Sequence, residues 1–434
     1  MFFKMFYKLL DLFDIVMQRD YYGFIQGHSY IKKKNINKIR NNNSQLVVKK
    51  YENKFSSLVG AGDTISFASA RMCFFSFMKA IGVKEKDEVI LNGSTCAVMV
   101  NAVLRIGAVP VFSDISSKSF GSCPDGIKKV LTPKSKLVVA QHSFGIPCEI
   151  NKIKELTKSK NIFLLEDCAL SVGSKFMDKN IGTFSDASIF STDRSKPINS
   201  ILGGLIYTKN KKLYKSLKVI QDQSKSLSKN KQDLIWNEFL LERKYLNPSG
   251  NKKYNLINSF SSFKRIFFIK NKSPFLNEDS GVSTSMSYPY PAKLPNFVAA
   301  IGILAIDNWK HELKTKKKNL KKYLKFFQNK GYGQYISKAY YDKNLKIIPS
   351  RFVFSTPDAQ KLRKKLKKYV DTTWIWFLRP IVDTNEPLYK FGYKGGSCPI
   401  SENIGKGMIN LPTNLSEKQT EDLLNKINKL FDIN

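Results

Sequence analysis

The chain is poor in acidic residues and in cysteine, and it lacks any long apolar run. Its 434 residues contain 35 Asp and Glu against 72 Lys and Arg, which gives a formal net charge of +37. The six cysteines form no Cys-x-x-Cys pair and no dense framework, which argues against a disulfide-stapled scaffold and favours a reducing compartment. No apolar run reaches the roughly 18 residues needed to cross a bilayer. We therefore expect a cytoplasmic protein that is neither secreted nor membrane-spanning.

The excess of basic residues leaves two interpretations open. Lysines scattered along the chain, accompanied by many Asn and Ile, are typical of a compositional bias over solvent-exposed faces. The alternative is attraction to anionic lipid or nucleic acid. The sequence has no zinc-finger spacing and no aromatic RNA-binding signature, so we expect no nucleic-acid partner and no bound metal ion.

Two segments carry apolar residues that could face a partner. Residues 1–19 have apolar side chains at helical spacing, and interspersed charges break any signal-peptide core. We expect an amphipathic helix there, docked either on the protein itself or on a membrane surface. Residues 260–270 interleave aromatic and basic side chains within the Lys-, Asn- and Ser-rich stretch 209–275. They indicate an exposed helix in an insertion, which packs on the core or a partner chain, or binds weakly to a membrane surface.

From residue 60 onward, helix-like and strand-like segments alternate. Short continuous apolar runs predict strands at residues 88–91, 109–112, 136–141, 162–165, 187–190 and 204–207. Helical patterns lie between and after them, at residues 69–81, 97–106, 150–159 and 296–309. Buried strands alternating with helices indicate an α/β fold, with a mostly parallel central sheet covered by helices on both faces.

The last part of the chain predicts a smaller α+β domain. It contains a Lys-rich helix at residues 357–369, a strand-like run at 373–378 and a terminal helix, which opens with Ser416 and Gln419 in a capping-box arrangement. We predict three parts from these patterns. They are an N-terminal amphipathic arm (1–57), a large domain (58–310) with the basic insertion 209–275, and a small C-terminal domain (311–434).

Polar side chains gather where the predicted strands end. Asp114, His142, Asp167 and Ser191 each lie at or just past a strand's carboxyl end, where ligands bind in open α/β sheets. Lys196 follows Ser191 closely. A carboxylate, a hydroxyl and a lysine so placed are what a pyridoxal 5′-phosphate (PLP) site requires. The acid pairs with the ring nitrogen, the hydroxyl meets the phosphate, and the lysine holds the cofactor covalently.

Several short segments, in order, resemble the DegT/StrS-type nucleotide-sugar aminotransferases, a family of the aspartate-aminotransferase (fold type I) superfamily. They are residues 67–71, 87–90, 94–96, 107–114, 142–147, 166–169, 190–196, 203–204, 398–399 and 410–413. The resemblance covers residues 50–210 well and 285–430 loosely. It implies that residues 58–310 form the PLP-binding large domain, and that the protein is a homodimer with its active site at the subunit boundary.

The resemblance also implies roles for individual residues. Lys196 would hold PLP covalently, with a surface lysine as the alternative. Asp167 would keep the ring nitrogen protonated, unless it is a structural carboxylate at a strand end. Ser191, Ser69 and the main-chain N–H of Ala70 would hold the phosphate, because a helix N-terminus favours an anion. A plain helix cap is the alternative for Ser69.

Three positions depart from the family pattern. Cys96 stands where an aromatic ring usually stacks on the cofactor, and Leu170 stands where an amide or imidazole usually contacts it. Pro291 aligns with the Asn that normally reaches the neighbouring subunit's phosphate, and Lys293 or Tyr290 are the candidates to replace it. A lysine rather than a histidine at position 196 disfavours the dehydratase branch of the family.

The implied activity is transfer of an amino group, from glutamate as donor, to a nucleotide-linked keto-sugar in polysaccharide or glycan synthesis. The basic surface would help to attract the anionic nucleotide diphosphate. Three alternatives stay open. They are the same chemistry on a non-sugar keto substrate, a relative that binds PLP but has lost catalysis, and a basic peripheral-membrane scaffold.

Overall fold

The computed structural model of the protein describes residues 21–42, 44, 46–246, 276, 281–284, 287–372 and 375–431. The predicted helix at residues 1–19 and the basic-aromatic segment 260–270 both lie outside these residues. Among the described helices, none combines the length and the apolar character that crossing a bilayer requires.

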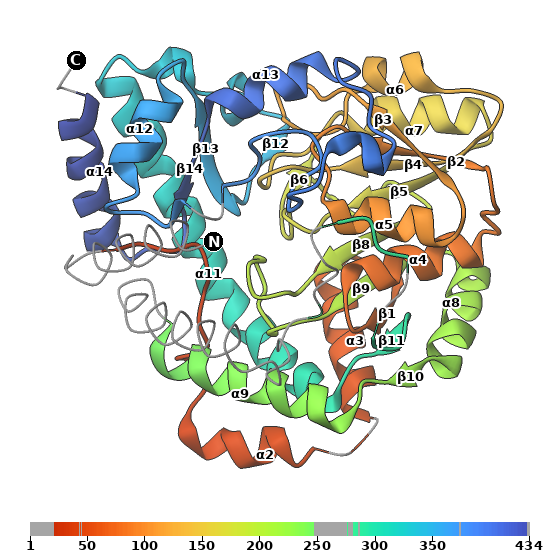
Figure 1. Ribbon diagram of the computed structural model, residues 1–434. Helices are drawn as coiled ribbons and strands as arrows, with labels where there is room; N and C mark the ends of the chain where they lie inside the picture. The colour runs from red at the N-terminus through yellow and green to blue at the C-terminus, as the bar shows by residue number, and fades with distance from the viewer. Residues whose placement is uncertain are drawn as a thin grey trace, which may run out of the picture.

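A seven-stranded sheet lies at the centre of the large part of the molecule (Figure 1). Its strands run in the order β1-β9-β8-β5-β4-β2-β3. The pairs from β8 to β3 are parallel, whereas β9 is antiparallel to both of its neighbours, β8 and β1. The strands are β1 (Asp63–Phe67), β2 (Glu88–Asn92), β3 (Val109–Ser113), β4 (Ser135–Gln141), β5 (Phe163–Asp167), β8 (Ala187–Ser191) and β9 (Gly204–Thr208). The predicted α/β fold with a mostly parallel sheet is confirmed.

Both faces of this sheet are covered by helices. Val89 and Leu91 of β2 belong to the largest core cluster, which also contains side chains of α4 (Ala70–Ala80) and α5 (Ala97–Arg105). Ile90, between them, belongs to a separate cluster with side chains of α6 (Pro124–Val130) and α7 (Ile150–Ser159). Successive strand residues point to opposite faces, so a sheet buried on both sides needs the continuous apolar runs seen in the sequence.

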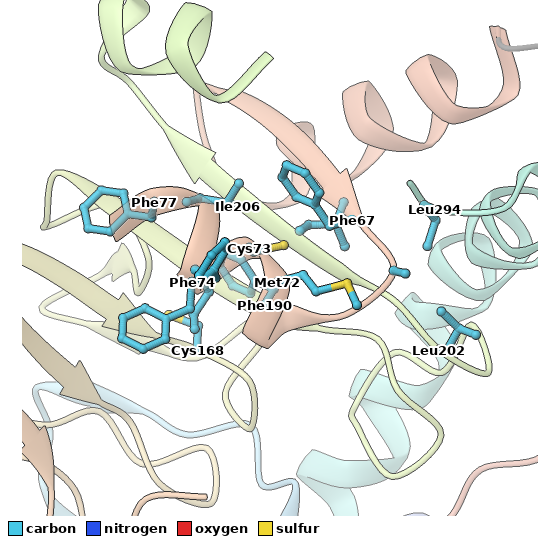
Figure 2. Packing of buried hydrophobic residues seen from close by; sticks show 14 of the residues in the cluster. Phe67, Met72, Cys73, Phe74, Phe77, Cys168, Phe190, Leu202, Ile206 and Leu294 are labelled. Carbon is cyan, nitrogen blue, oxygen red and sulfur yellow. The ribbon is translucent and has the colours of Figure 1, made fainter. Parts of the chain in front are cut away.

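Helix α4 is held against the sheet by its apolar side chains. Figure 2 shows Met72, Phe74 and Phe77 packed among side chains of the neighbouring strands, including Phe190 of β8 and Ile206 of β9. All five are at most 1% exposed. This packing fixes the N-terminus of α4 beside the end of β8.

Other elements surround the sheet or extend it. Helices α2 (Ile36–Arg40), α3 (Leu46–Val59), α8 (Lys211–Gln223) and α9 (Lys229–Tyr245) lie around the large part, and the long α11 (Asn296–Asn329) runs from it towards the C-terminal part (Figure 1). Short strands pair outside the central sheet: β6 (Lys175–Phe176) with β7 (Lys179–Asn180) and β12 (Leu345–Lys346), and β10 (Lys225–Ser226) with β11 (Ala292–Lys293). 3₁₀ turns lie at Lys33–Asn35, Gly333–Tyr335, Lys338–Tyr341 and Leu388–Phe391.

The C-terminal residues build a second core. The antiparallel pair β13 (Arg351–Ser355) and β14 (Met408–Pro412) packs with α12 (Ala359–Leu366), α13 (Pro399–Gly407) and α14 (Glu417–Phe431). Tyr323 and Phe327 of α11 belong to this second core, whereas Trp309 of the same helix belongs to the first. The boundary that we predicted between residues 310 and 311 therefore falls inside one continuous helix.

The capping box predicted at the start of α14 is confirmed. The main-chain N–H of Ser416 donates to Oε1 of Gln419 (2.9 Å), and the N–H of Gln419 donates to Oγ of Ser416 (3.4 Å). These reciprocal bonds satisfy donors that have no partner within the helix.

The strand predicted for residues 373–378 is wrong over the described residues 375–378, which form no regular element. The main-chain N–H of Trp376 donates to the side chain of Asn410 (2.9 Å) instead of to a neighbouring strand. Phe377 is fully buried and stacks on Phe144 with a centroid distance of 6.2 Å. The apolar run therefore reflects burial of individual side chains rather than strand pairing.

Candidate active site

A cavity of about 300 Å³ lies at the carboxyl ends of β4, β5 and β8. All seven residues predicted to contact a cofactor line it: Ser69, Ala70, Cys96, Asp167, Leu170, Ser191 and Lys196. The volume is within the range of natural small-molecule sites. Lys196 and Asp167 therefore face one shared space, from two different strand ends.

The adjacent carboxylates Glu166 and Asp167 serve different faces of the sheet. Asp167 lines the cavity and is 8% exposed, and its Oδ1 accepts from the N–H of Ala169 (3.0 Å). Burial raises the pKa of Asp167, although the Ala169 bond and the nearby Lys196 oppose this. Glu166 is fully buried and accepts main-chain bonds from Gly182 (2.5 Å) and other groups. Alternation along β5 thus sends one acid to the cavity and one to a structural site.

His142 is held by protein groups at both ring nitrogens. The main-chain N–H of Cys148 donates to Nδ1 (3.1 Å), which leaves the ring proton on Nε2, facing Oε1 of Glu166 (3.2 Å). The side chain is fully buried and forms part of the cavity wall. Cys168 lies close enough for the three side chains to share a cation. The carboxylate is, however, already occupied by several donors, which favours a satisfied hydrogen-bond network.

The N-terminus of α4 faces the cavity. Ser69 is the N-cap residue, with extended backbone angles (φ −159°, ψ 160°), yet its side chain makes no capping hydrogen bond. Its Oγ is buried and has no hydrogen-bond partner among the described residues, and the residue is 7% exposed. Leaving a buried hydroxyl unpaired costs free energy, so a ligand contact explains this side chain better than a plain cap does.

A close backbone contact fixes this N-terminus. Ser69 bridges to Gly203, and an added Cβ at Gly204 would lie 2.1 Å from the main-chain nitrogen of Ala70. Only glycine fits at position 204, and the chain that follows the lysine loop can therefore lie directly against the start of α4.

The loop that carries Lys196 is anchored from outside the sheet. Lys196 donates its main-chain N–H to the carbonyl of Asp193 (2.9 Å), and its Nζ lies 5.7 Å from the ring centroid of Trp376. Arg194, which lies between Asp193 and Lys196 in the loop, is buried and forms an ion pair with Glu242 of α9 (Nε–Oε1 2.7 Å). Helix α9, which lies in the predicted insertion, thus contacts the loop that carries Lys196.

Two of the three positions that depart from the family pattern, Cys96 and Leu170, also line the cavity, whereas Pro291 does not. Sγ of Cys96 donates to Oδ2 of Asp383 (3.4 Å). Burial, reinforced by that carboxylate, raises the pKa of the Cys96 thiol well above its ordinary value. Leu170 is 6% exposed and offers only apolar surface. Both residues shape the wall, and neither offers a charged group to a ligand.

Of the four strand-end residues predicted to mark the ligand edge, Asp114 is the exception. Its Oδ2 accepts from the N–H of Ile400 (2.9 Å) and its Oδ1 from the N–H of Ser401 (3.0 Å), at the start of α13. Asp114 is therefore a helix cap that joins the C-terminal part to the sheet, and it does not line the cavity.

Some lining residues were missed by the sequence analysis. They are Arg71, Asp193, Trp376 and Asp383. Arg71 and Asp193 adjoin predicted contacts, so their proximity to Ser69 and Lys196 was a usable signal. Trp376 and Asp383 come from the C-terminal part, and no local pattern connects them to this edge of the sheet.

Comparisons with known proteins point in one direction. The model of the DegT/DnrJ/EryC1/StrS aminotransferase family matches residues 34–428. GDP-perosamine synthase of Escherichia coli O157:H7 is 35% identical over 167 residues, which are 38% of this chain and 46% of that protein. Spore coat polysaccharide biosynthesis protein SpsC of Bacillus subtilis is 30% identical over 173 residues, 40% of this chain and 44% of that one. The chain thus spans less than half the length of these curated relatives.

Solved structures share the fold over almost the whole chain. Helicobacter pylori PseC, an aminotransferase involved in the biosynthesis of pseudoaminic acid, matches with a TM-score of 0.70 at 16% identity, covering 95% of this chain and 99% of that one. DesI, crystallised in the presence of its TDP-sugar product, matches with a TM-score of 0.70 at 17% identity, covering 96% and 93%.

Proposed function

Because this chain belongs to the DegT/DnrJ/EryC1/StrS family of PLP-dependent aminotransferases, we propose that it moves an amino group from glutamate to a keto-sugar attached to a nucleotide. The family resemblance noted in the sequence is thereby confirmed. The names of two similar proteins, GDP-perosamine synthase and UDP-N-acetyl-3-dehydro-alpha-D-glucosamine 3-aminotransferase, each contain a nucleotide-linked sugar. That shared chemistry supports the choice of acceptor.

The lining residues of the cavity fit PLP. The hydroxyl of Ser69, at a helix N-terminus and without a partner among the described residues, suits a phosphate. A buried carboxylate, Asp167, suits a protonated ring nitrogen. When bound, PLP supplies an electron sink that stabilises negative charge at the substrate carbon bearing the nitrogen. The observation that carries the proposal is that Lys196 and Asp167 line one cavity.

Each lining group then has a distinct task in our proposal. Lys196 attaches the cofactor through Nζ, and the same nitrogen later takes up and returns a proton. Asp167 holds a proton on the ring nitrogen. Ser69, Ser191 and the N–H of Ala70 bind the phosphate. Cys96 and Leu170 serve as neutral walls.

The proposal is tested by the visible absorption spectrum of the purified protein. We expect a band from bound cofactor that glutamate diminishes and that a nucleotide-linked keto-sugar restores, with an amino-sugar product detected by mass spectrometry. Lys196→Ala should lower turnover by roughly a thousandfold or more and change the band. Lys209→Ala, an exposed lysine outside the cavity, should alter neither.

Two results would speak against parts of the proposal. A band that glutamate leaves unchanged would remove glutamate as the donor. Turnover of a free keto-sugar as fast as that of the nucleotide-linked one would remove the nucleotide from the substrate.

We propose in addition a homodimer with its active site at the subunit boundary, as the resemblance implies. Light scattering of the purified chain measures the assembly directly. The membrane-scaffold alternative depends on residues 1–19 and 260–270, which lie outside the described residues.

A further inference from the structure

Arg71 adds a full positive charge to the helix end that faces the cavity. It is the second residue of α4 and lines the cavity together with Ser69, Ala70 and Ser191. The first turn of α4 has no acidic residue, so nothing within that turn offsets the guanidinium. A helix N-terminus already favours an anion, and a cation there strengthens the preference.

A second observation points to a ligand at this place. Ser69 is more than nine-tenths buried and lines the same cavity, and its hydroxyl makes no hydrogen bond within the part of the chain that the structure describes. The helix beneath is immobilised by its core, with Met72, Cys73 and Phe74 packed as Figure 2 shows. The hydroxyl is thus fixed in position for a ligand that brings its own acceptor or donor.

Neighbouring groups hold both the side chain and the main chain of Arg71. Arg71 donates through Nη2 to the carbonyl of Leu276, and the hydroxyl of Tyr290 donates to the carbonyl of Arg71 (3.4 Å). Its charge also acts on Asp193: burial raises the pKa of that carboxyl, while Lys196, Arg71 and Arg194 oppose the rise. A guanidinium has five N–H donors, so its bond to Leu276 is compatible with a bidentate contact to a phosphate.

We propose that Arg71 binds the phosphate of PLP, alongside Ser69 and the N–H of Ala70. The inference rests on the proposed function, because it adds a binding residue to the same cofactor site. Arginine suits this role better than lysine, since its planar fork matches two phosphate oxygens at once. The chain thereby supplies a phosphate contact from its own α4.

The experiment compares PLP with pyridoxal, which differ only in the phosphate. Both ligands are titrated into the cofactor-free, full-length protein, and binding is followed by absorbance and by tryptophan fluorescence. Arg71→Met should weaken PLP binding by roughly ten- to a hundredfold, and pyridoxal binding by less than about twofold. Arg71→Lys should recover part of the preference for PLP. Lys79→Met, which removes the same charge from an exposed position of α4, should change neither affinity.

The outcomes separate this inference from the function on which it rests. If Arg71→Met weakens both ligands equally, or weakens neither, then Arg71 has no phosphate contact and the inference falls while the cofactor site stands. If the wild-type protein binds neither ligand, both fall. Thermal unfolding of the cofactor-free variants checks their folding. Should Arg71→Met not fold, Arg71→Gln and Arg71→Lys carry the same comparison, and an unchanged preference for PLP in both overturns the inference.

Discussion

At the scale of single residues, β5 shows how one position along a strand changes the role of an acid. Glu166 is surrounded by donors, so its charge is well solvated by the protein. Burial acts to raise the pKa of Glu166, but His142 and the other donors hold it below its usual range. Asp167 has the Ala169 bond and otherwise faces the cavity, so its charge is poorly compensated until a cationic group arrives.

Asp167→Asn is therefore expected to stabilise the cofactor-free protein at neutral pH, by on the order of 1 kcal/mol. The raised pKa means that the native state binds a proton more tightly than the unfolded chain does. Stability then falls as pH rises from the unfolded pKa through the native pKa of Asp167. Asparagine keeps an acceptor for the Ala169 N–H and carries no charge, so the variant escapes this loss. Urea unfolding from acidic to neutral pH measures the difference in the free energy of unfolding between the variant and the wild type. This difference should vanish at acidic pH, where the wild-type carboxyl is protonated.

Glu166→Gln is the matched comparison, and its expected effect on the free energy of unfolding has the opposite sign. A carboxyl with a lowered pKa contributes stability above the unfolded pKa, and this contribution is lost as pH falls through the native pKa. The variant should thus be less stable than the wild type at neutral pH. A destabilised Asp167→Asn, or a stabilised Glu166→Gln, would mean that the two environments are not as different as the hydrogen bonds indicate.

The sequence identified cavity residues wherever a local pattern marks them. Asp167 and Ser191 lie at the ends of apolar runs, and Ser69 lies where a helical pattern starts, so strand and helix ends alone bring them to one edge. Trp376 and Asp383 reach the cavity only because the C-terminal part packs beside the sheet. That packing depends on the whole second core, which no short segment reveals. The roles of all these residues remain predictions.

At the scale of elements, helix α9 illustrates how a compositionally unusual segment supports the site. Glu242 pairs with Arg194 of the lysine loop and lies 3.4 Å from Nε2 of His28. It also accepts from Nδ2 of Asn199 (3.2 Å). Both Arg194 and Glu242 are buried, and Glu238 lies 3.7 Å from Nη2 of Arg194, so removing Glu242 leaves the buried guanidinium with a more distant carboxylate. The loop is thereby tied to a helix that the sequence marked only as an insertion.

Glu242→Ala is expected to lower the free energy of unfolding by about 3 kcal/mol, because it removes the nearer of two buried carboxylates that pair with Arg194, the other being Glu238 at 3.7 Å. Burial acts to raise the pKa of Glu242, but Arg194, His28 and Asn199 hold it below its usual range. The contribution of Glu242 should therefore be complete above the unfolded pKa and decline as pH falls through the native pKa. Urea unfolding at several pH values measures this, and the difference from wild type should shrink at acidic pH.

Asp222→Ala on α8 is the control for that prediction. Asp222 forms an exposed i,i+4 pair with Lys218, a kind of pair that contributes little to stability. Equal effects of the Asp222 and Glu242 variants would contradict the view that burial makes the α9 contact important.

Elements were predicted well where periodicity and burial agree. The strands of the parallel sheet are buried on both faces, so their apolar runs are unmistakable. Helix α11 was predicted to end at residue 309 but continues to Asn329. The prediction stopped too early because the second half of the helix is rich in lysine and buries only a narrow stripe of side chains, which includes Leu320, Tyr323 and Phe327. The strand predicted over residues 375–378 is absent, because the apolar run there reflects the burial of Phe377 in the core and not pairing with a neighbouring strand.

At the scale of the whole molecule, α11 joins two cores that meet at the cavity. Its first half packs with α3 and the large core, and its second half packs with α14 and the second core. Asp114 adds a further tie, since it caps α13 of the C-terminal part from a loop next to β3. Residues of both cores, Met99 of the first and Trp376 beside the second among them, line the cavity. The geometry of the site therefore depends on how the two cores are held together.

The net charge of +37 also acts at this scale, and the sequence left its meaning open. If the charge steers an anionic nucleotide-sugar to the cavity, kcat/KM for that substrate should fall about tenfold as NaCl rises from about 0.05 to 0.5 M, because salt screens long-range attraction. Since steering acts on encounter rather than on chemistry, kcat should stay nearly constant. A free keto-sugar carries no charge, and its kcat/KM should not respond to salt. If kcat/KM for the nucleotide-sugar is equally independent of salt, the excess of lysine reflects compositional bias on faces remote from the cavity. The reason is that only charges near the path of the substrate can change its rate of binding.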